Sequence, residues 1–210
     1  MNFVHRTRIK ICGLTRNEDV RAAVEAGADA IGFVFYPPSP RFVSFEQAAD
    51  LARSVPPFVS VVGLFVNPSR TFVEQACAAV PLQVLQFHGD ESEADCIGFG
   101  LPYIKAARMR QGFDLLKYAA AFPGAQGLLL DAFVEGYGGG GETFDWSLIP
   151  SRLPQPLILS GGLNAKNVGE AVRRVRPWAV DVSSGVEVAK GIKDVARITE
   201  FVAGVQNAHG

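Results

Sequence analysis

Short apolar runs rich in β-branched and aromatic residues recur along the whole chain, and each is followed by a segment whose apolar residues return at helical spacing. The two periods alternate, and neither forms a block of its own. The apolar runs predict strands at residues 8–12, 30–35, 59–66, 84–88, 103–107, 127–131, 157–160 and 179–182. The helical spacing predicts helices at residues 17–26, 45–55, 69–79, 91–97, 112–122, 145–149, 164–175 and 193–206.

This alternation indicates parallel βα units. Residues 31–35 are apolar at nearly every position, as is typical of a parallel sheet covered on both faces. Eight units in 210 residues average about 26 residues each, near the lower size limit of a (β/α)8 barrel. We therefore predict an α/β protein with a single (β/α)8 barrel domain over residues 1–210. A doubly wound open sheet is the alternative, but residues 12–15, in the first strand–helix turn, lack the G-x-G-x-x-G pattern of dinucleotide-binding folds.

Composition and charge narrow the possible partners. Twenty Lys and Arg residues stand against twenty-one Asp and Glu residues, so the basic excess needed to bind a nucleic-acid backbone is missing. The longest strongly apolar stretch, residues 58–66, is too short to cross a bilayer, and the N-terminus lacks a signal-peptide core, so we expect no membrane partner. Cys12, Cys77 and Cys96 form no C-x-x-C pair, which argues against a disulfide framework or a metal site and favours the reducing cytoplasm.

Reactive and small residues gather where the predicted strands end, and barrel enzymes place their active sites there. They are Lys10, Cys12, Arg41, Gln86, His88, Asp131, Ser160, Gly161, Gly162, Asp181, Ser183, Ser184 and Gly185. The turns after the seventh and eighth strands, Gly161-Gly162 and Ser183-Ser184-Gly185, offer backbone N–H groups and helix N-termini that favour an anion. We expect a phosphate group there, although ordinary tight turns also use these residue types.

Two of these residues are suited to moving protons. Cys12 ends the first predicted strand and Asp131 ends the sixth, so a closed barrel would point both side chains into one cavity. A thiolate can act as a general base, and a carboxyl group beside apolar walls can stay protonated and act as an acid. The alternatives are a cysteine that only packs in the core and a carboxylate that caps a helix or lies on a surface loop.

Three further features are open to two interpretations. Arg41 follows a proline-rich segment and is suited to a bidentate grip on a carboxylate, or it is a solvated surface arginine. His88 either binds a ligand or caps the fourth strand. The four glycines at 138–141 belong either to a mobile cover over the barrel mouth or to a flexible surface loop.

A series of short motifs runs in order through nearly the whole chain: KICGLT at 10–15, GFVF at 32–35, SPR at 39–41, QFHG at 86–89, LLD at 129–131, GGGG at 138–141, TFDW at 143–146, LSGGL at 159–163 and DVSSGVE at 181–187. Together they resemble the phosphoribosylanthranilate isomerases of tryptophan biosynthesis. The resemblance implies a small (β/α)8 barrel that uses no cofactor and acts on a small phosphorylated substrate.

The resemblance also implies roles for individual residues. Cys12 would be the general base, Asp131 the general acid and Arg41 the group that binds the anthranilate carboxylate; Gly161, Gly162, Ser183 and Ser184 would bind the phosphate. The implied reaction is an Amadori rearrangement of an aminoaldose to an aminoketose. A flavin enzyme that binds the FMN phosphate at the same turns and a non-catalytic module that binds a phosphorylated metabolite are the alternatives. The oligomeric state stays open.

Overall fold

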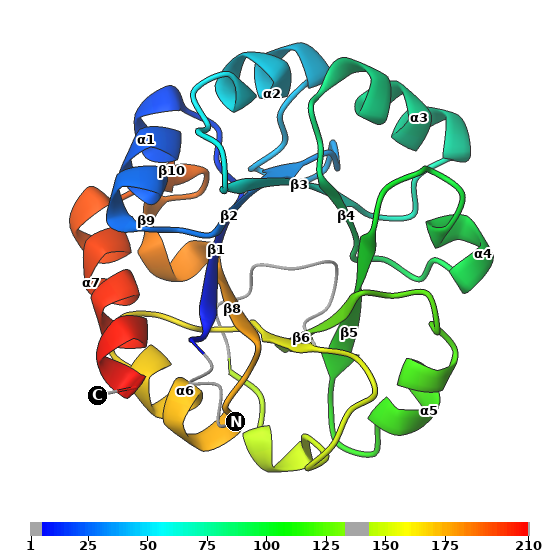
Figure 1. Cartoon of the computed structure of the whole chain (residues 1–210), viewed down its shortest axis with the longest axis vertical. Coiled ribbons are helices and arrows are strands. Elements are labelled where there is room, and N and C mark those ends of the chain that lie inside the picture. Colours follow the sequence, from blue (N-terminus) through cyan, green and yellow to red (C-terminus); the bar gives the residue numbers. More distant parts are fainter. Residues whose placement is uncertain (1–5, 133–142, 210) are drawn as a thin grey trace.

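Eight parallel strands close into a barrel in this computed structural model, which describes residues 6–132 and 143–209 (Figure 1). Each strand pairs with the next in sequence, and β8 closes the barrel by pairing with β1. The strands are β1 (Arg8–Cys12), β2 (Ala30–Val34), β3 (Ser60–Phe65), β4 (Val84–Phe87), β5 (Tyr103–Met109), β6 (Gly127–Ala132), β7 (Leu157–Leu159) and β8 (Ala179–Val182). The predicted (β/α)8 barrel is confirmed.

Helices surround the barrel on its outer side (Figure 1). They are α1 (Asn17–Ala26), α2 (Phe45–Ala52), α3 (Arg70–Ala79), α4 (Glu93–Cys96), α5 (Leu115–Ala120), α6 (Val168–Val175) and α7 (Val195–Gln206), with short 3₁₀ turns η1 (Trp146–Leu148), η2 (Ser184–Val186) and η3 (Asn207–His209). Within the described ranges, no helix is long and apolar enough to cross a membrane. Side chains of Ser44, Ser69 and Asp194 cap α2, α3 and α7 by accepting backbone N–H bonds. Each cap contributes about 1 kcal/mol.

The apolar core has an inner and an outer layer because alternate residues of each strand face opposite sides of the sheet. The inner layer fills the barrel with the buried cluster Ala106, Leu129, Ile158 and Ala179. The outer layer lies between the strands and the helices and includes a row of phenylalanines. The rings of Phe35 and Phe65 are 5.3 Å apart, and those of Phe65 and Phe87 are 6.0 Å apart. The interior is therefore packed, and polar side chains occupy only part of it.

The structure differs from the sequence prediction mainly in the short elements. Residues 145–149, predicted as a helix, form only the 3₁₀ turn η1, and the helix predicted at 91–97 is the single turn α4. The helix predicted at 164–175, which is α6, begins at Val168, because the Asn164 and Asn167 side chains hold the preceding residues in a turn. An antiparallel pair of strands that the hydrophobic pattern did not predict, β9 (Glu187–Ala189) and β10 (Ile192–Lys193), follows β8.

Candidate active site

Most of the predicted site residues lie at the C-terminal end of the barrel. The strand pleat turns Lys10 and Cys12 of β1 to the same side, and it does the same for Gln86 and His88 at the end of β4. The side chains of these four residues are buried, as are those of Asp131 on β6 and Asp181 on β8. A set of titratable groups therefore converges inside the barrel.

Cys12 lies in a buried, charged environment. On β8, the Asp181 carboxylate accepts a 2.8 Å hydrogen bond from the Lys10 ammonium, and Lys10 is also within hydrogen-bonding reach of Cys12. Burial raises the pKa of the Cys12 thiol, and the nearby Lys10 charge opposes that rise. Burial thus favours the neutral thiol, and the cation beside the sulfur favours its thiolate form.

Asp131 has two polar neighbours. Its Oδ1 accepts the backbone N–H of Ala132 at 2.9 Å, and its Oδ2 lies 3.2 Å from His88 Nε2. The Gln86 side-chain nitrogen is 3.2 Å from His88 Nδ1. When that amide donates to Nδ1, a neutral imidazole carries its proton on Nε2, toward Asp131.

Two buried polar atoms of the predicted site have no hydrogen-bond partner among the residues that the structure describes. They are Gln86 Oε1 and His88 Nε2, the second because its approach to Asp131 lacks hydrogen-bond alignment. Buried polar groups are nearly always satisfied in folded proteins, so these two atoms are free to bond a polar group of a ligand. Ligand binding by His88 therefore stays a prediction.

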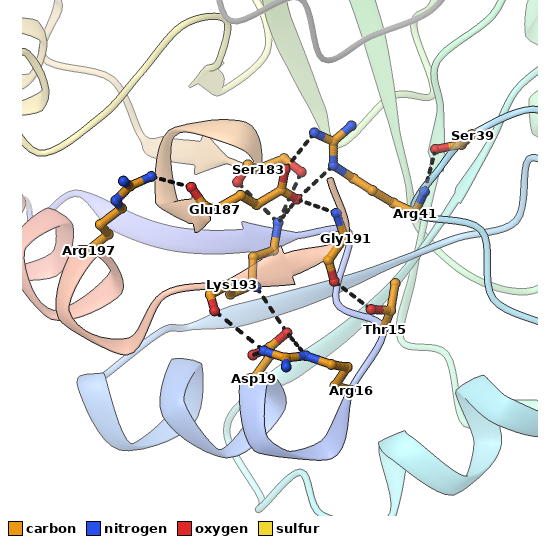
Figure 2. Close-up of polar contacts among 10 residues, drawn as sticks. All are labelled: Thr15, Arg16, Asp19, Ser39, Arg41, Ser183, Glu187, Gly191, Lys193 and Arg197. Carbon is orange, nitrogen blue, oxygen red and sulfur yellow. Dashed lines mark hydrogen bonds and ion pairs between the residues drawn. The ribbon is translucent and has the colours of Figure 1, made fainter. Parts of the chain in front are cut away.

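Arg41 makes the predicted bidentate contact, but with a carboxylate of the protein. Its Nε and Nη2 donate to the two carboxylate oxygens of Glu187 on β9, each at 2.8 Å (Figure 2). Neither bond uses Nη1. Arg41 is buried, so the alternative of a solvated surface arginine is wrong.

Lys193 of β10 completes this ionic cluster (Figure 2). Its ammonium donates to Glu187 at 2.7 Å and to the backbone carbonyl oxygen and hydroxyl of Ser183 at 3.1 and 3.2 Å. Burial works against a charged Glu187, but its bonds to Arg41 and Lys193 lower the pKa of the carboxyl. Burial lowers the pKa of Lys193. The cluster fixes Arg41 and the Ser183 turn relative to each other.

The predicted phosphate turns lie side by side. Gly161 and Gly162 both have positive φ, at 81° and 62°, and a Cβ atom on Gly161 would lie 2.6 Å from the backbone nitrogen of Ala132. A Cβ atom on Gly185 would lie only 1.9 Å from the carbonyl oxygen of Leu163, so the turn after β8 packs directly on the turn after β7. Ser184, like Gly161 and Gly162, is partly exposed at this place. The four glycines at 138–141 lie outside the described residues.

Sequence reasoning assigned no role to several buried charges. Glu187 and Lys193 lie beyond the last predicted strand; Glu187 ends the DVSSGVE motif, and Lys193 is the first residue of the helix predicted at 193–206, although it lies in β10. Lys105 is fully buried on β5 and donates to Glu91 at 2.9 Å and to the backbone of Gly89, next to His88. The lysine in the middle of the apolar strand predicted at 103–107 is the sequence feature that could have pointed to the buried Lys105–Glu91 ion pair. No group of His, Cys, Asp or Glu side chains within residues 6–132 and 143–209 could hold a metal ion.

Comparison with known proteins identifies the family. Residues 9–204 match the family model for N-(5'-phosphoribosyl)anthranilate (PRA) isomerase. The chain belongs to this family. The N-(5'-phosphoribosyl)anthranilate isomerase of Dechloromonas aromatica is 67% identical over 97% of this chain and 98% of its own length. The predicted family, and with it the isomerase class, are confirmed.

Solved structures agree with the sequence comparison. The Thermotoga maritima phosphoribosyl anthranilate isomerase has a TM-score of 0.88 and 42% identity, covering 96% of this chain and 99% of that one. A second phosphoribosyl anthranilate isomerase structure has a TM-score of 0.84 and 40% identity, covering 96% of this chain and 99% of its own. That second protein was solved in complex with reduced 1-(o-carboxyphenylamino)-1-deoxyribulose 5-phosphate.

Proposed function

We propose that this chain converts N-(5-phosphoribosyl)anthranilate to 1-(2-carboxyphenylamino)-1-deoxyribulose 5-phosphate, the isomerisation after which its family is named. The observation that carries the proposal is the placement of a buried thiol and a buried carboxyl group, Cys12 and Asp131, at the same end of one barrel. Their strands β1 and β6 are separated by β7 and β8, so the two groups approach the barrel axis from different sides. A substrate between them can be protonated on one side and deprotonated on the other.

The proton movements are an acid step followed by a base step. Asp131 in its protonated form donates its proton to the furanose ring oxygen, the bond from that oxygen to C1' breaks, and the nitrogen lone pair forms a Schiff base. The Cys12 thiolate then removes the proton from C2', which gives an enolamine that tautomerises to the ketone. An acid or a base so positioned contributes about 10² to 10⁴ in rate.

His88 and Gln86 supply polar contacts for the sugar. His88 Nε2, which is 3.2 Å from Asp131 Oδ2, and Gln86 Oε1 are both unsatisfied, so sugar hydroxyls can accept from the first and donate to the second. The charges nearby suit the anionic ends of the substrate. Arg41 and Lys193 share one carboxylate, so their cluster carries excess positive charge, and Arg41 Nη1 is the nitrogen proposed to bind the anthranilate carboxylate.

The phosphate is proposed to bind between the turns after β7 and β8. Small side chains and two hydroxyls lie on these adjacent backbone turns, which permits close approach of an anion to main-chain N–H groups; the residues are Gly161, Gly162, Ser183 and Ser184.

We also propose that the enzyme works in a reducing compartment such as the cytoplasm. The free state of its three cysteines, Cys12, Cys77 and Cys96, supports this.

The test is the loss of phosphoribosylanthranilate fluorescence when purified protein is added to freshly prepared substrate. We expect a rapid decay with the wild-type protein and a loss of kcat of at least about 10² in Cys12→Ser and in Asp131→Asn, with unchanged thermal stability. A variant that keeps near-normal kcat removes its residue from the mechanism. Substrate binding in calorimetry without fluorescence decay would favour the non-catalytic binding module.

A further inference from the structure

We propose that Lys10 is a positioning residue that stabilises the thiolate form of Cys12, and that Asp181 holds the Lys10 ammonium in place for this purpose. The inference deepens the proposed function, because it rests on Cys12 as the base. It concerns two side chains to which the proposed acid–base steps assign no role.

The strand geometry brings the ammonium and the sulfur together. Lys10 and Cys12 are two residues apart on β1 and face the same side, over Gly32 of the neighbouring strand. A Cβ atom on Gly32 would lie 2.8 Å from the Cys12 sulfur and 3.2 Å from Lys10 Nζ. Both atoms therefore occupy the space that a side chain on β2 would fill, and any residue larger than glycine would push them out of it.

The strand register holds Lys10 in this place. Lys10 and Asp181 are direct partners in the pairing of β1 with β8, and Nζ lies 2.8 Å from Asp181 Oδ1. Both side chains are more than nine-tenths buried. A buried ion pair is costly to desolvate and is often no more stable than well-packed apolar residues of the same volume. Its presence beside a reactive thiol is therefore better explained by what it does to that thiol than by fold stability.

Charged groups from several elements act on the Cys12 sulfur. Lys10 comes from its own strand, Asp181 from β8, Lys193 from β10 and Arg41 from the loop after β2. Burial raises the pKa of the thiol most strongly, Lys10 is the main group that lowers it, Asp181 raises it and Lys193 lowers it. Burial also disfavours a charged Lys10, but Asp181 and Cys12 raise the pKa of its ammonium above the ordinary value. Lys10 is thus a permanent cation next to a group that ionises during the reaction.

Two substitutions with opposite expected effects test the inference. Lys10→Met keeps the length of the side chain and removes its charge, so the thiolate becomes harder to form. Asp181→Asn keeps a side-chain oxygen that can accept from the Lys10 ammonium and hold it in place, but it removes a negative charge near the sulfur, so the thiolate becomes easier to form. A role confined to packing would disturb Cys12 in the same way in both variants.

The measurement is the rate of Cys12 alkylation by iodoacetamide across a pH series, followed by mass spectrometry of the peptide that contains it. The midpoint of the curve of alkylation rate against pH reports where the thiol ionises. We expect Lys10→Met to move this midpoint up by about one pH unit or more, which lowers the thiolate fraction about tenfold at pH values below it. Asp181→Asn should move it down, and Lys10→Arg should restore most of the wild-type midpoint. Lys117→Met, an exposed lysine on α5, is the matched control and should change nothing.

In each variant, the pH at which kcat/KM begins to fall on the acid side should shift in the same direction as the alkylation midpoint. An unchanged midpoint in Lys10→Met, or shifts of the same sign in Lys10→Met and Asp181→Asn, would overturn the inference. If Lys10→Met does not fold, Lys10→Arg and Asp181→Asn still decide the sign of the effect. Alkylation needs no turnover, so a normal kcat in Cys12→Ser would refute the proposed base while leaving the charge effect of Lys10 measurable.

Discussion

Replacing Glu187 by Gln removes the carboxylate on which the cationic cluster depends. Glu187 accepts two bonds from Arg41 and one from Lys193 and is almost fully buried. Glutamine has nearly the same shape but no charge, and its amide nitrogen faces donors instead of accepting from them. Two buried cations are then left next to each other without an anion.

The magnitude follows from these contacts. Removing one partner of a buried ion pair costs about 3 to 5 kcal/mol. For a chain of this length each kcal/mol shifts Tm by about 2 to 4 °C, so we expect Tm to fall by about 6 to 20 °C. Arg41 also loses at least one of the two bonds that orient its guanidinium, so we expect KM to rise about tenfold with a much smaller change in kcat, the signature of weakened ground-state binding.

The pH dependence of this loss has a definite sign. The pKa of Glu187 is lowered in the folded protein by Arg41 and Lys193, which overcome the effect of burial. Its contribution to stability is therefore fully present above the ordinary glutamate pKa and is lost as the pH falls through the lower folded value. The difference in Tm between the wild-type protein and Glu187→Gln should therefore shrink as the pH is lowered.

Thermal denaturation at several pH values and steady-state kinetics by the fluorescence assay measure these effects. Glu200→Gln, at an exposed position on α7, is the control and should keep both Tm and KM. A Glu187→Gln protein with wild-type Tm and KM at neutral pH would refute the reasoning, because it would mean that the cluster neither stabilises the fold nor positions Arg41.

Three further predictions concern the site. Gly161→Ala should cost about 1 to 3 kcal/mol and reduce kcat, because the Cβ atom would lie 2.9 Å from Asp131 Oδ1 at a positive φ; Gly100→Ala, with a similar φ of 72° and open space around it, is the control that should keep kcat. Arg41→Met should raise KM far more than it lowers kcat, and an unchanged KM would exclude substrate contact. Because burial raises the pKa of the Cys12 thiol, kcat/KM should still be increasing when the pH passes the ordinary pKa of cysteine. A profile in which kcat/KM levels off below that pH would contradict this.

The sequence by itself determined where most of the barrel elements lie. The predicted bounds of β1 and α1 match the structure, because strand and helix patterns act over a few neighbouring residues, and Gly27, with a φ of 98°, ends α1. The same local logic located Cys12 and Asp131 at strand ends. In a parallel barrel, the end of a strand is also the end at which the site is built.

Only the tertiary structure decided which charges meet. Lys10 and Asp181 are 171 residues apart and pair only because β8 closes on β1 in one register. Arg41 and Glu187 are 146 residues apart, and the short strand β9, which carries Glu187, has no hydrophobic pattern of its own. Local patterns predict elements because propensity and spacing act along the chain. The pairing of buried ions depends on strand register and barrel closure, which arise only when distant segments pack together.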